Sequence, residues 1–116
     1  MADKKREAKV LAEVTGKSAE LAKLIEYAAD AVVSKTLLDK EAGTVTLFAF
    51  DEGQKLSEHQ APFDAMVQVV DGEGTFFIGG EEVNCKAGEV LVMPANVPHS
   101  VLAGERFKML LTMIRG

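Results

Sequence analysis

The sequence predicts an all-β protein, an antiparallel β-barrel preceded by a short helical segment. From about residue 31, β-branched and aromatic residues come in short runs, separated by turn residues at fairly regular intervals. No helical pattern separates these runs as βαβ units would require, so a parallel sheet is disfavoured. Closure into a barrel or sandwich is then the simplest way to hide the sheet edges.

The residues before the strands, 3–29, carry apolar side chains at helix spacing. We expect two short helices here, with a break at Gly16. Ser18 is the expected N-cap of the second helix, and Glu20 lies in its first turn, where the helix dipole favours negative charge. This pattern divides the chain into an N-terminal helical segment, residues 1–29, and a β-barrel domain, residues 30–116.

Nine runs have the composition and length of strands. The turns between them contain residues that tolerate a positive φ, at 71–74, 79–80, 86–88 and 104–105. Such short turns make neighbouring strands mostly antiparallel. The expected strands are Ala31–Leu38, Thr44–Phe50, Gln54–Gln60, Ala65–Val70, Thr75–Ile78, Glu81–Cys85, Glu89–Met93, His99–Leu102 and Arg106–Ile114.

Composition narrows the possible functions. A chain of 116 residues with 47% hydrophobic and 27% charged residues is typical of one globular domain. The net charge of -5 disfavours nucleic acid as a partner, because binding to phosphates needs a basic surface. The single cysteine, Cys85, excludes an intrachain disulfide. We find no signal peptide and no apolar stretch long enough for a membrane span, so we expect a cytoplasmic protein with no membrane partner.

Both histidines of the chain lie in distinctive motifs. His59 ends a segment that begins at Gly53, with Gly72 thirteen residues later, and His99 ends the segment from Gly88 to His99 through Pro94. These spacings resemble the two motifs of the cupin family. Asn96 stands where the second motif usually has glycine, and asparagine best keeps a left-handed turn conformation. The resemblance implies an antiparallel jelly-roll barrel.

The first motif is incomplete. Ala61 stands where cupins have a second histidine, and Ala65 stands where they have a glutamate. In metal-binding cupins these two positions and the two conserved histidines hold the ion, so the resemblance leaves His59 and His99 as the possible ligands. Two protein ligands seldom hold a divalent ion tightly. Asp64 is a possible third ligand, although a turn-capping carboxylate is the simpler interpretation.

Strand alternation places His59, Ala61 and Ala65 on the face that looks into the barrel. We expect a ligand pocket there, in which the two imidazoles lie within about one water's reach of each other. The other expected pocket residues are Phe63 and Met93. The remaining methionines, Met66, Met109 and Met113, are interpreted as core-filling residues.

The favoured function is small-molecule binding by this pocket, with at most a weakly bound divalent metal such as Zn, Fe, Mn or Ni. The alternative is a metal-dependent enzyme, an oxygenase or isomerase of small organic acids or sugars, as resemblance to the wider family implies. A sensory or regulatory module is a third possibility. We also expect a homodimer, because a barrel edge needs covering, and we expect residues 1–17 to be dispensable for folding.

Overall fold

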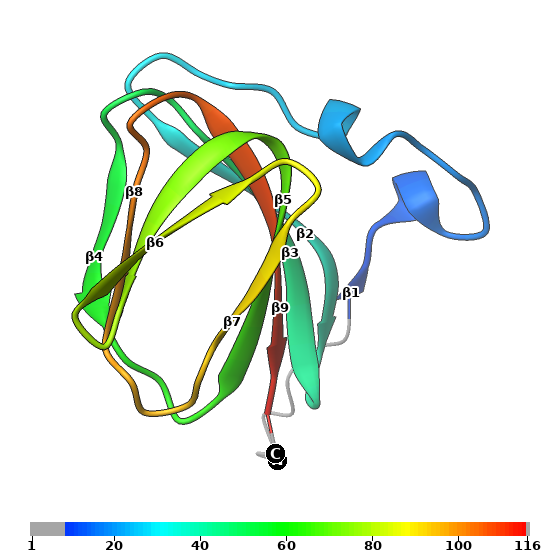
Figure 1. Cartoon of the computed structure of the whole chain (residues 1–116). Coiled ribbons are helices and arrows are strands. Elements are labelled where there is room, and N and C mark those ends of the chain that lie inside the picture. The colour runs from blue at the N-terminus through cyan, green and yellow to red at the C-terminus, as the bar shows by residue number, and fades with distance from the viewer. Residues whose placement is uncertain (1–8, 116) are drawn as a thin grey trace.

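A computed structural model describes residues 9–115, which form an antiparallel β-barrel with an N-terminal segment along its outside (Figure 1). Every pair of adjacent strands is antiparallel, which confirms the predicted fold class. The strands are β1 (Lys9–Val10), β2 (Val32–Lys40), β3 (Gly43–Phe50), β4 (Lys55–His59), β5 (Asp64–Ile78), β6 (Glu81–Lys86), β7 (Val90–Met93), β8 (His99–Leu102) and β9 (Phe107–Ile114).

The strands form two sheets that share β5. The first half of β5 pairs with β9 and β7, and β9 continues through β3 and β2 to β1. The second half of β5 pairs with β6 and with β8, which in turn pairs with β4. The long strand therefore passes from one wall of the barrel to the other.

The continuity of β5 corrects one expectation from the sequence. Residues 71–74 were predicted as a turn between two strands, but they continue the strand across a register shift between Val69 and Asp71. Gly74 is needed here for space, because a Cβ atom at this position would lie 2.6 Å from the Phe107 ring. The predicted turn at Gly79 and Gly80 is present, and both residues have positive φ.

The two short helices predicted for the N-terminal segment are, over the described residues, two single 3₁₀ turns on either side of Gly16: η1 (Ala12–Val14) and η2 (Leu21–Lys23). Residues 9 and 10 of the expected first helix form β1 instead. The N-cap of η2 is Glu20, not Ser18, and no side chain caps it. Residues 3–8 of the expected first helix lie outside the described range. Within residues 9–115, no helix is long and apolar enough to cross a membrane.

The extended N-terminal segment is held by contacts that a regular helix would not allow. Lys35 Nζ donates to the Leu24 carbonyl at 3.0 Å, and Lys108 Nζ donates to the Ala22 carbonyl at 2.6 Å. Each of these carbonyls would be an acceptor within an α-helix. Helical stretches this short are also marginal without such competition. Tertiary contacts with the barrel therefore override the local helix preference.

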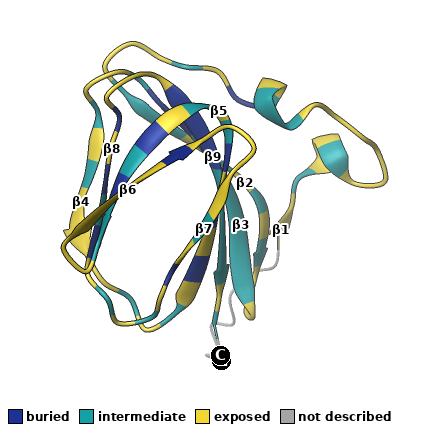
Figure 2. Cartoon of the chain, viewed as in Figure 1, coloured by how far each residue is buried: buried dark blue, intermediate teal, exposed yellow. Residues whose placement is uncertain are grey.

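Docking of this segment buries part of the outer sheet face. Ile25 packs against Leu47 and Ala49 of β3, both of which are fully buried (Figure 2). The Tyr27 hydroxyl donates a hydrogen bond to Asp71, and the Lys108 ammonium lies 4.8 Å from the centre of the Tyr27 ring. The N-terminal segment thus forms a small second core outside the barrel.

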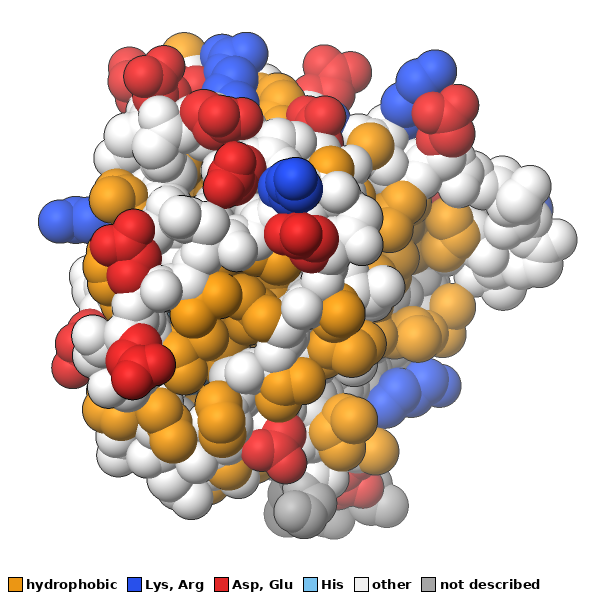
Figure 3. Space-filling model, viewed as in Figure 1, with side chains coloured by type: hydrophobic (Ala, Val, Ile, Leu, Met, Phe, Trp, Pro, Cys, Tyr) orange, Lys and Arg blue, Asp and Glu red, His pale blue; other side chains and the backbone are white. Residues whose placement is uncertain are grey.

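The rest of this outer face keeps apolar side chains exposed. Met66 of β5 lies opposite Val92 of β7, and Val90 lies two residues from Val92 on the same face. Ile114 of β9 lies on this face too and is 64% exposed. On the face of the molecule seen in Figure 3, apolar side chains gather near the middle, with acidic side chains around them.

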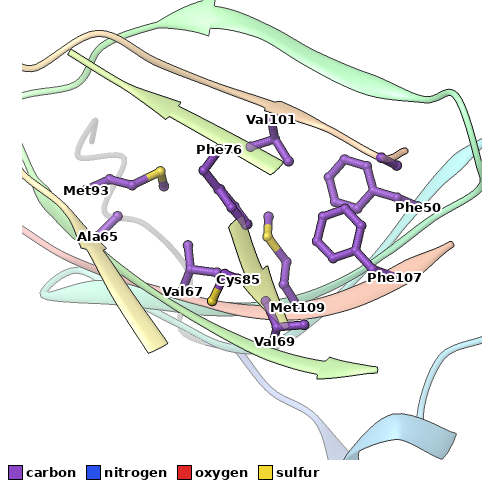
Figure 4. Close-up of a cluster of buried hydrophobic side chains, with 11 residues drawn as sticks. Phe50, Ala65, Val67, Val69, Phe76, Cys85, Met93, Val101, Phe107 and Met109 are labelled. Atoms are coloured by element: carbon purple, nitrogen blue, oxygen red, sulfur yellow. The ribbon is translucent and has the colours of Figure 1, made fainter. Parts of the chain in front are cut away.

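The main core fills the inside of the barrel (Figure 4). Phe50 and Phe107 stack with ring centroids 4.6 Å apart, and Phe76 meets Phe107 edge-on. Val67 and Met109 pack beside them, and all five side chains are fully or almost fully buried. The stacked aromatic rings of Phe50 and Phe107 fill one end of the barrel interior, and Ala65 and Met93 lie toward the other end.

Candidate functional site

A pocket of about 110 Å³ opens near the end of the barrel where β4 ends and β8 begins. Its lining contains two histidines and is otherwise apolar, without any Asp, Glu, Lys or Arg. The lining residues are Leu56, His59, Ala61, Phe63, Ala65, Met93, His99, Val101, Met109, Leu111 and Met113.

Two loops shape the mouth of this pocket. The Asn96 backbone N–H donates to the Ala61 carbonyl at 2.7 Å, which joins the loop after β7 to the loop after β4. Asn96 has a φ of 63°, the left-handed conformation expected at this motif position. The Ala95 N–H donates to Asp64 Oδ1 at 2.9 Å. The second motif therefore supplies a fixed turn as well as a histidine.

The strand register brings the two histidines together. His59, the last residue of β4, lies directly opposite His99, the first residue of β8. Residues in such pairs project side chains to the same face. The two Nε2 atoms are 3.1 Å apart, closer than the one-water separation expected from the sequence. The ring centroids are 4.3 Å apart and the planes are inclined by 71°, so the two rings meet edge to face.

The backbone around each histidine sets its tautomer. His59 Nδ1 lies 2.9 Å from the Ser57 carbonyl oxygen, and His99 Nδ1 lies 3.1 Å from the Val97 carbonyl oxygen. Because a carbonyl oxygen can only accept, each Nδ1 carries the hydrogen in these bonds. The 3.1 Å contact between the two Nε2 atoms is then a hydrogen bond only when the pair holds an extra proton, whereas in the neutral pair both Nε2 atoms are acceptors. The pair thus presents two adjacent lone pairs to the pocket.

Burial favours the neutral form of His99. The side chain is 7% exposed, and desolvation lowers the pKa of His99 below the usual histidine value. The hydrogen bond to the Val97 carbonyl opposes this shift, and the neighbouring His59 adds to it. His59 itself is exposed at the rim of the pocket. The two imidazoles therefore form the boundary between an apolar interior and solvent.

The structure brings all six sequence-predicted pocket residues into this lining, and it adds five that the sequence reasoning missed. Met109, Leu111 and Met113 alternate along β9, so they share one face. The two methionines were interpreted only as core-filling residues, and Leu111 was not singled out. Val101 lies two residues after His99 in β8, so the two side chains share one face of the strand. Leu56 lies three residues before His59, and only the register shift between them brings both to the pocket.

Asp64 does not join the two histidines. Its side chain accepts a hydrogen bond from the Ala95 backbone, and it does not line the pocket. The turn-capping interpretation of this carboxylate fits the structure. Within residues 9–115, no cluster of three or more His, Cys, Asp or Glu side chains could hold a metal ion. The two Nε2 atoms are close enough to share one ion as neighbouring ligands, with the other ligands supplied by water.

The described residues thus form a small antiparallel barrel with an apolar pocket that contains two histidines. A family model described as the cupin domain matches residues 46–114. The chain therefore belongs to the cupin family.

Solved structures of other proteins resemble the chain over most of its length. A conserved protein of unknown function from Streptococcus pyogenes is 32% identical, with a TM-score of 0.84 over 88% of this chain and 90% of that one. A cupin superfamily protein from Desulfitobacterium hafniense is 26% identical, with a TM-score of 0.86 over 96% of this chain and 100% of that one.

A cupin 2 conserved barrel domain protein from Leptotrichia buccalis is 42% identical, with a TM-score of 0.79. The match covers 81% of this chain but 46% of that one, so this chain corresponds to about half of the Leptotrichia protein. A comparison with curated proteins found no match.

Proposed function

We propose that this protein binds a small, mostly apolar molecule in the pocket that contains His59 and His99. The observation that carries this proposal is the contrast within one cavity: an apolar wall and one polar group of two adjacent imidazoles. Binding sites for small molecules are commonly built in this way, with a few polar groups fixing the orientation of the ligand.

The shape of the pocket supports an internal ligand. Ala61 and Ala65 replace the larger side chains of the family motif, and both lie in the lining. Small side chains at these positions leave space beside the imidazoles. An apolar cavity of about 150 Å³ is known to hold benzene, so the 110 Å³ here limits the enclosed part of a ligand to about one small ring.

A pocket-filling variant tests this proposal. Ala61→Leu adds three carbon atoms at the half-buried mouth of the pocket, whereas Ala87→Leu adds the same atoms at an exposed turn. Ligand-observed NMR with a mixture of small ring compounds is expected to show binding to the wild type and to Ala87→Leu, with binding lost in Ala61→Leu. Equal binding by all three proteins would place the bound compounds outside the pocket and contradict the proposal.

A second candidate is a metal-dependent cupin enzyme, and the tautomer of the two histidines favours it. An imidazole that donates from Nδ1 to a backbone carbonyl presents Nε2 to a metal ion in the usual orientation. His59 and His99 would hold the ion, and it would supply Lewis acidity toward a small oxygen-containing substrate. With two protein ligands, such an ion would be weakly bound.

Metal analysis separates the two candidates. We expect untagged protein to take up Zn, Fe, Mn or Ni only weakly, and to lose the ion on dialysis against EDTA. Uptake should fall at acidic pH, because a protonated imidazole cannot bind a metal. A stoichiometric ion that survives EDTA, together with activity that depends on it, would favour the enzyme.

A further inference from the structure

We infer that the ligand of this pocket is a small hydroxylated ring, whose hydroxyl group donates to the Nε2 atoms of His59 and His99. This inference rests on the proposed function, because it names the chemical class of the ligand for the same pocket. Three features carry it: the hydrogen-bonding state of the imidazoles, the character of the wall and the different depths of the two histidines.

The polar atoms of the pocket are acceptors. The two Nδ1–H groups donate hydrogen bonds to the carbonyls of Ser57 and Val97. Because a neutral imidazole carries only one N–H, Nε2 of each neutral ring has no hydrogen. The two Nε2 atoms are 3.1 Å apart, so one donor on a ligand can reach both. A ketone or ether has no hydrogen to donate, and its oxygen would lose its bonds to water without replacement.

The surroundings of the imidazoles distinguish a hydroxyl from other donors. A ligand ammonium group would be charged, and the lining contains no carboxylate to pair with it. An amide would bring a carbonyl oxygen as well as its N–H, and no side chain of the lining is left to donate to that oxygen. A carboxylate meets the same obstacle. A hydroxyl carries one hydrogen, which the two adjacent acceptors can share in a three-centre hydrogen bond.

The body of the ligand is defined by the wall. Met93 and Met113 contribute thioether groups, and Phe63 contributes an aromatic ring. Thioethers make favourable contacts with aromatic rings and adapt their shape to them. The cavity volume of about 110 Å³ admits one ring but not two. A single planar ring therefore matches both the chemistry and the size of the space.

The depths of the two histidines set the orientation. His99 is buried and His59 is exposed, so the pair lies between the interior and the solvent. A hydroxyl bound to both Nε2 atoms would keep its oxygen near water at the mouth of the pocket. The ring would then extend inward to Met109 and Leu111, which also belong to the lining.

Phenol and toluene provide the direct test, because they have nearly the same shape and differ in the hydroxyl group. We expect phenol to bind the wild type about threefold to tenfold more tightly than toluene, as one net hydrogen bond would give. Dissociation constants can be measured by NMR titration of the untagged, EDTA-treated protein. In His59→Ala, which alters an exposed side chain, the dissociation constants of phenol and toluene should become nearly equal.

Glu58→Ala is the matched control. Glu58 is the neighbour of His59, is exposed and does not line the pocket, so this variant should keep the full preference for phenol. Equal affinities of phenol and toluene in the wild type would overturn the inference while leaving the proposed function intact. A preference for phenol that survives in His59→Ala would overturn it as well. Failure of both compounds to bind would contradict the proposed function itself.

Discussion

His59 and His99 show how the backbone can define the chemistry of a side chain. Each imidazole donates a hydrogen bond from Nδ1 to a backbone carbonyl two residues earlier in the chain. The acceptor is the Ser57 carbonyl for His59 and the Val97 carbonyl for His99. The motif spacing in the sequence indicated that the two rings converge. It could not give their tautomers, because these depend on the local path of the backbone. It also could not place Leu56 in the pocket, because a register shift in β4 breaks the alternation.

The lowered pKa of His99 predicts a pH dependence of stability. The folded protein keeps this imidazole neutral at pH values at which the unfolded chain protonates it. The unfolded state therefore binds more protons, so the free energy of unfolding should fall as the pH drops below about 6.5, until the pH is below the folded pKa. Urea unfolding between about pH 7.5 and about pH 5.5 should show a smaller loss for His99→Gln than for the wild type. Equal losses would contradict the assignment.

Asn96 offers a second test at the scale of one residue. Its φ of 63° is costly for most residues, and its N–H joins the two loops at the pocket mouth. We expect Asn96→Ala to lower the free energy of unfolding by about 1 kcal/mol, whereas Asn96→Gly should have almost no effect, because glycine adopts this conformation without a steric penalty. Chemical denaturation of both variants measures this difference. A larger loss in Asn96→Gly than in Asn96→Ala would show that the asparagine side chain matters for another reason.

Among the elements, the strands were predictable and the N-terminal segment was not. Alternating apolar residues and Gly turns gave most strand bounds to within two residues, since these signals are local. The segment before β2 has helix-like spacing, but Ile25 and Tyr27 dock in a non-helical conformation on the barrel. The docking involves Lys35, 11 residues from its partner Leu24, and Lys108, 86 residues from its partner Ala22. No local pattern could show these contacts.

This segment divides into a dispensable part and a docked part. None of the described residues 9–17 is buried, so deletion of residues 1–17 should lower the free energy of unfolding by at most a few kcal/mol.

Ile25→Ala should lower the free energy of unfolding by about 2–4 kcal/mol, because Ile25 is 5% exposed and packs against Leu47 and Ala49. The exposed neighbour Glu26, replaced by alanine, is the control. If the deletion variant were unfolded, residues 1–17 would not be dispensable. If Ile25→Ala were as stable as the wild type, docking of Ile25 would not stabilise the barrel.

At the scale of the whole molecule, the barrel has one outer sheet face that the N-terminal segment covers only in part. Met66, Val90, Val92 and Ile114 remain exposed on this face. We propose that a second copy of the chain covers them, since contiguous exposed apolar surface is costly in water. Light scattering at micromolar concentration should give twice the monomer mass of 12.5 kDa. Val92→Lys should shift the protein toward the monomer. A monomeric wild type would exclude this arrangement.

The proposed binding site in the barrel interior beside His59 and His99 can be tested directly through the methionines. Met93, Met109 and Met113 line the pocket, whereas Met66 lies on the outer face. In a ¹³C-methyl NMR titration with phenol, the methyl signals of the three pocket methionines should shift together with one dissociation constant. The Met66 signal should stay in place. Shifts at Met66 without shifts at Met93, Met109 and Met113 would contradict the account.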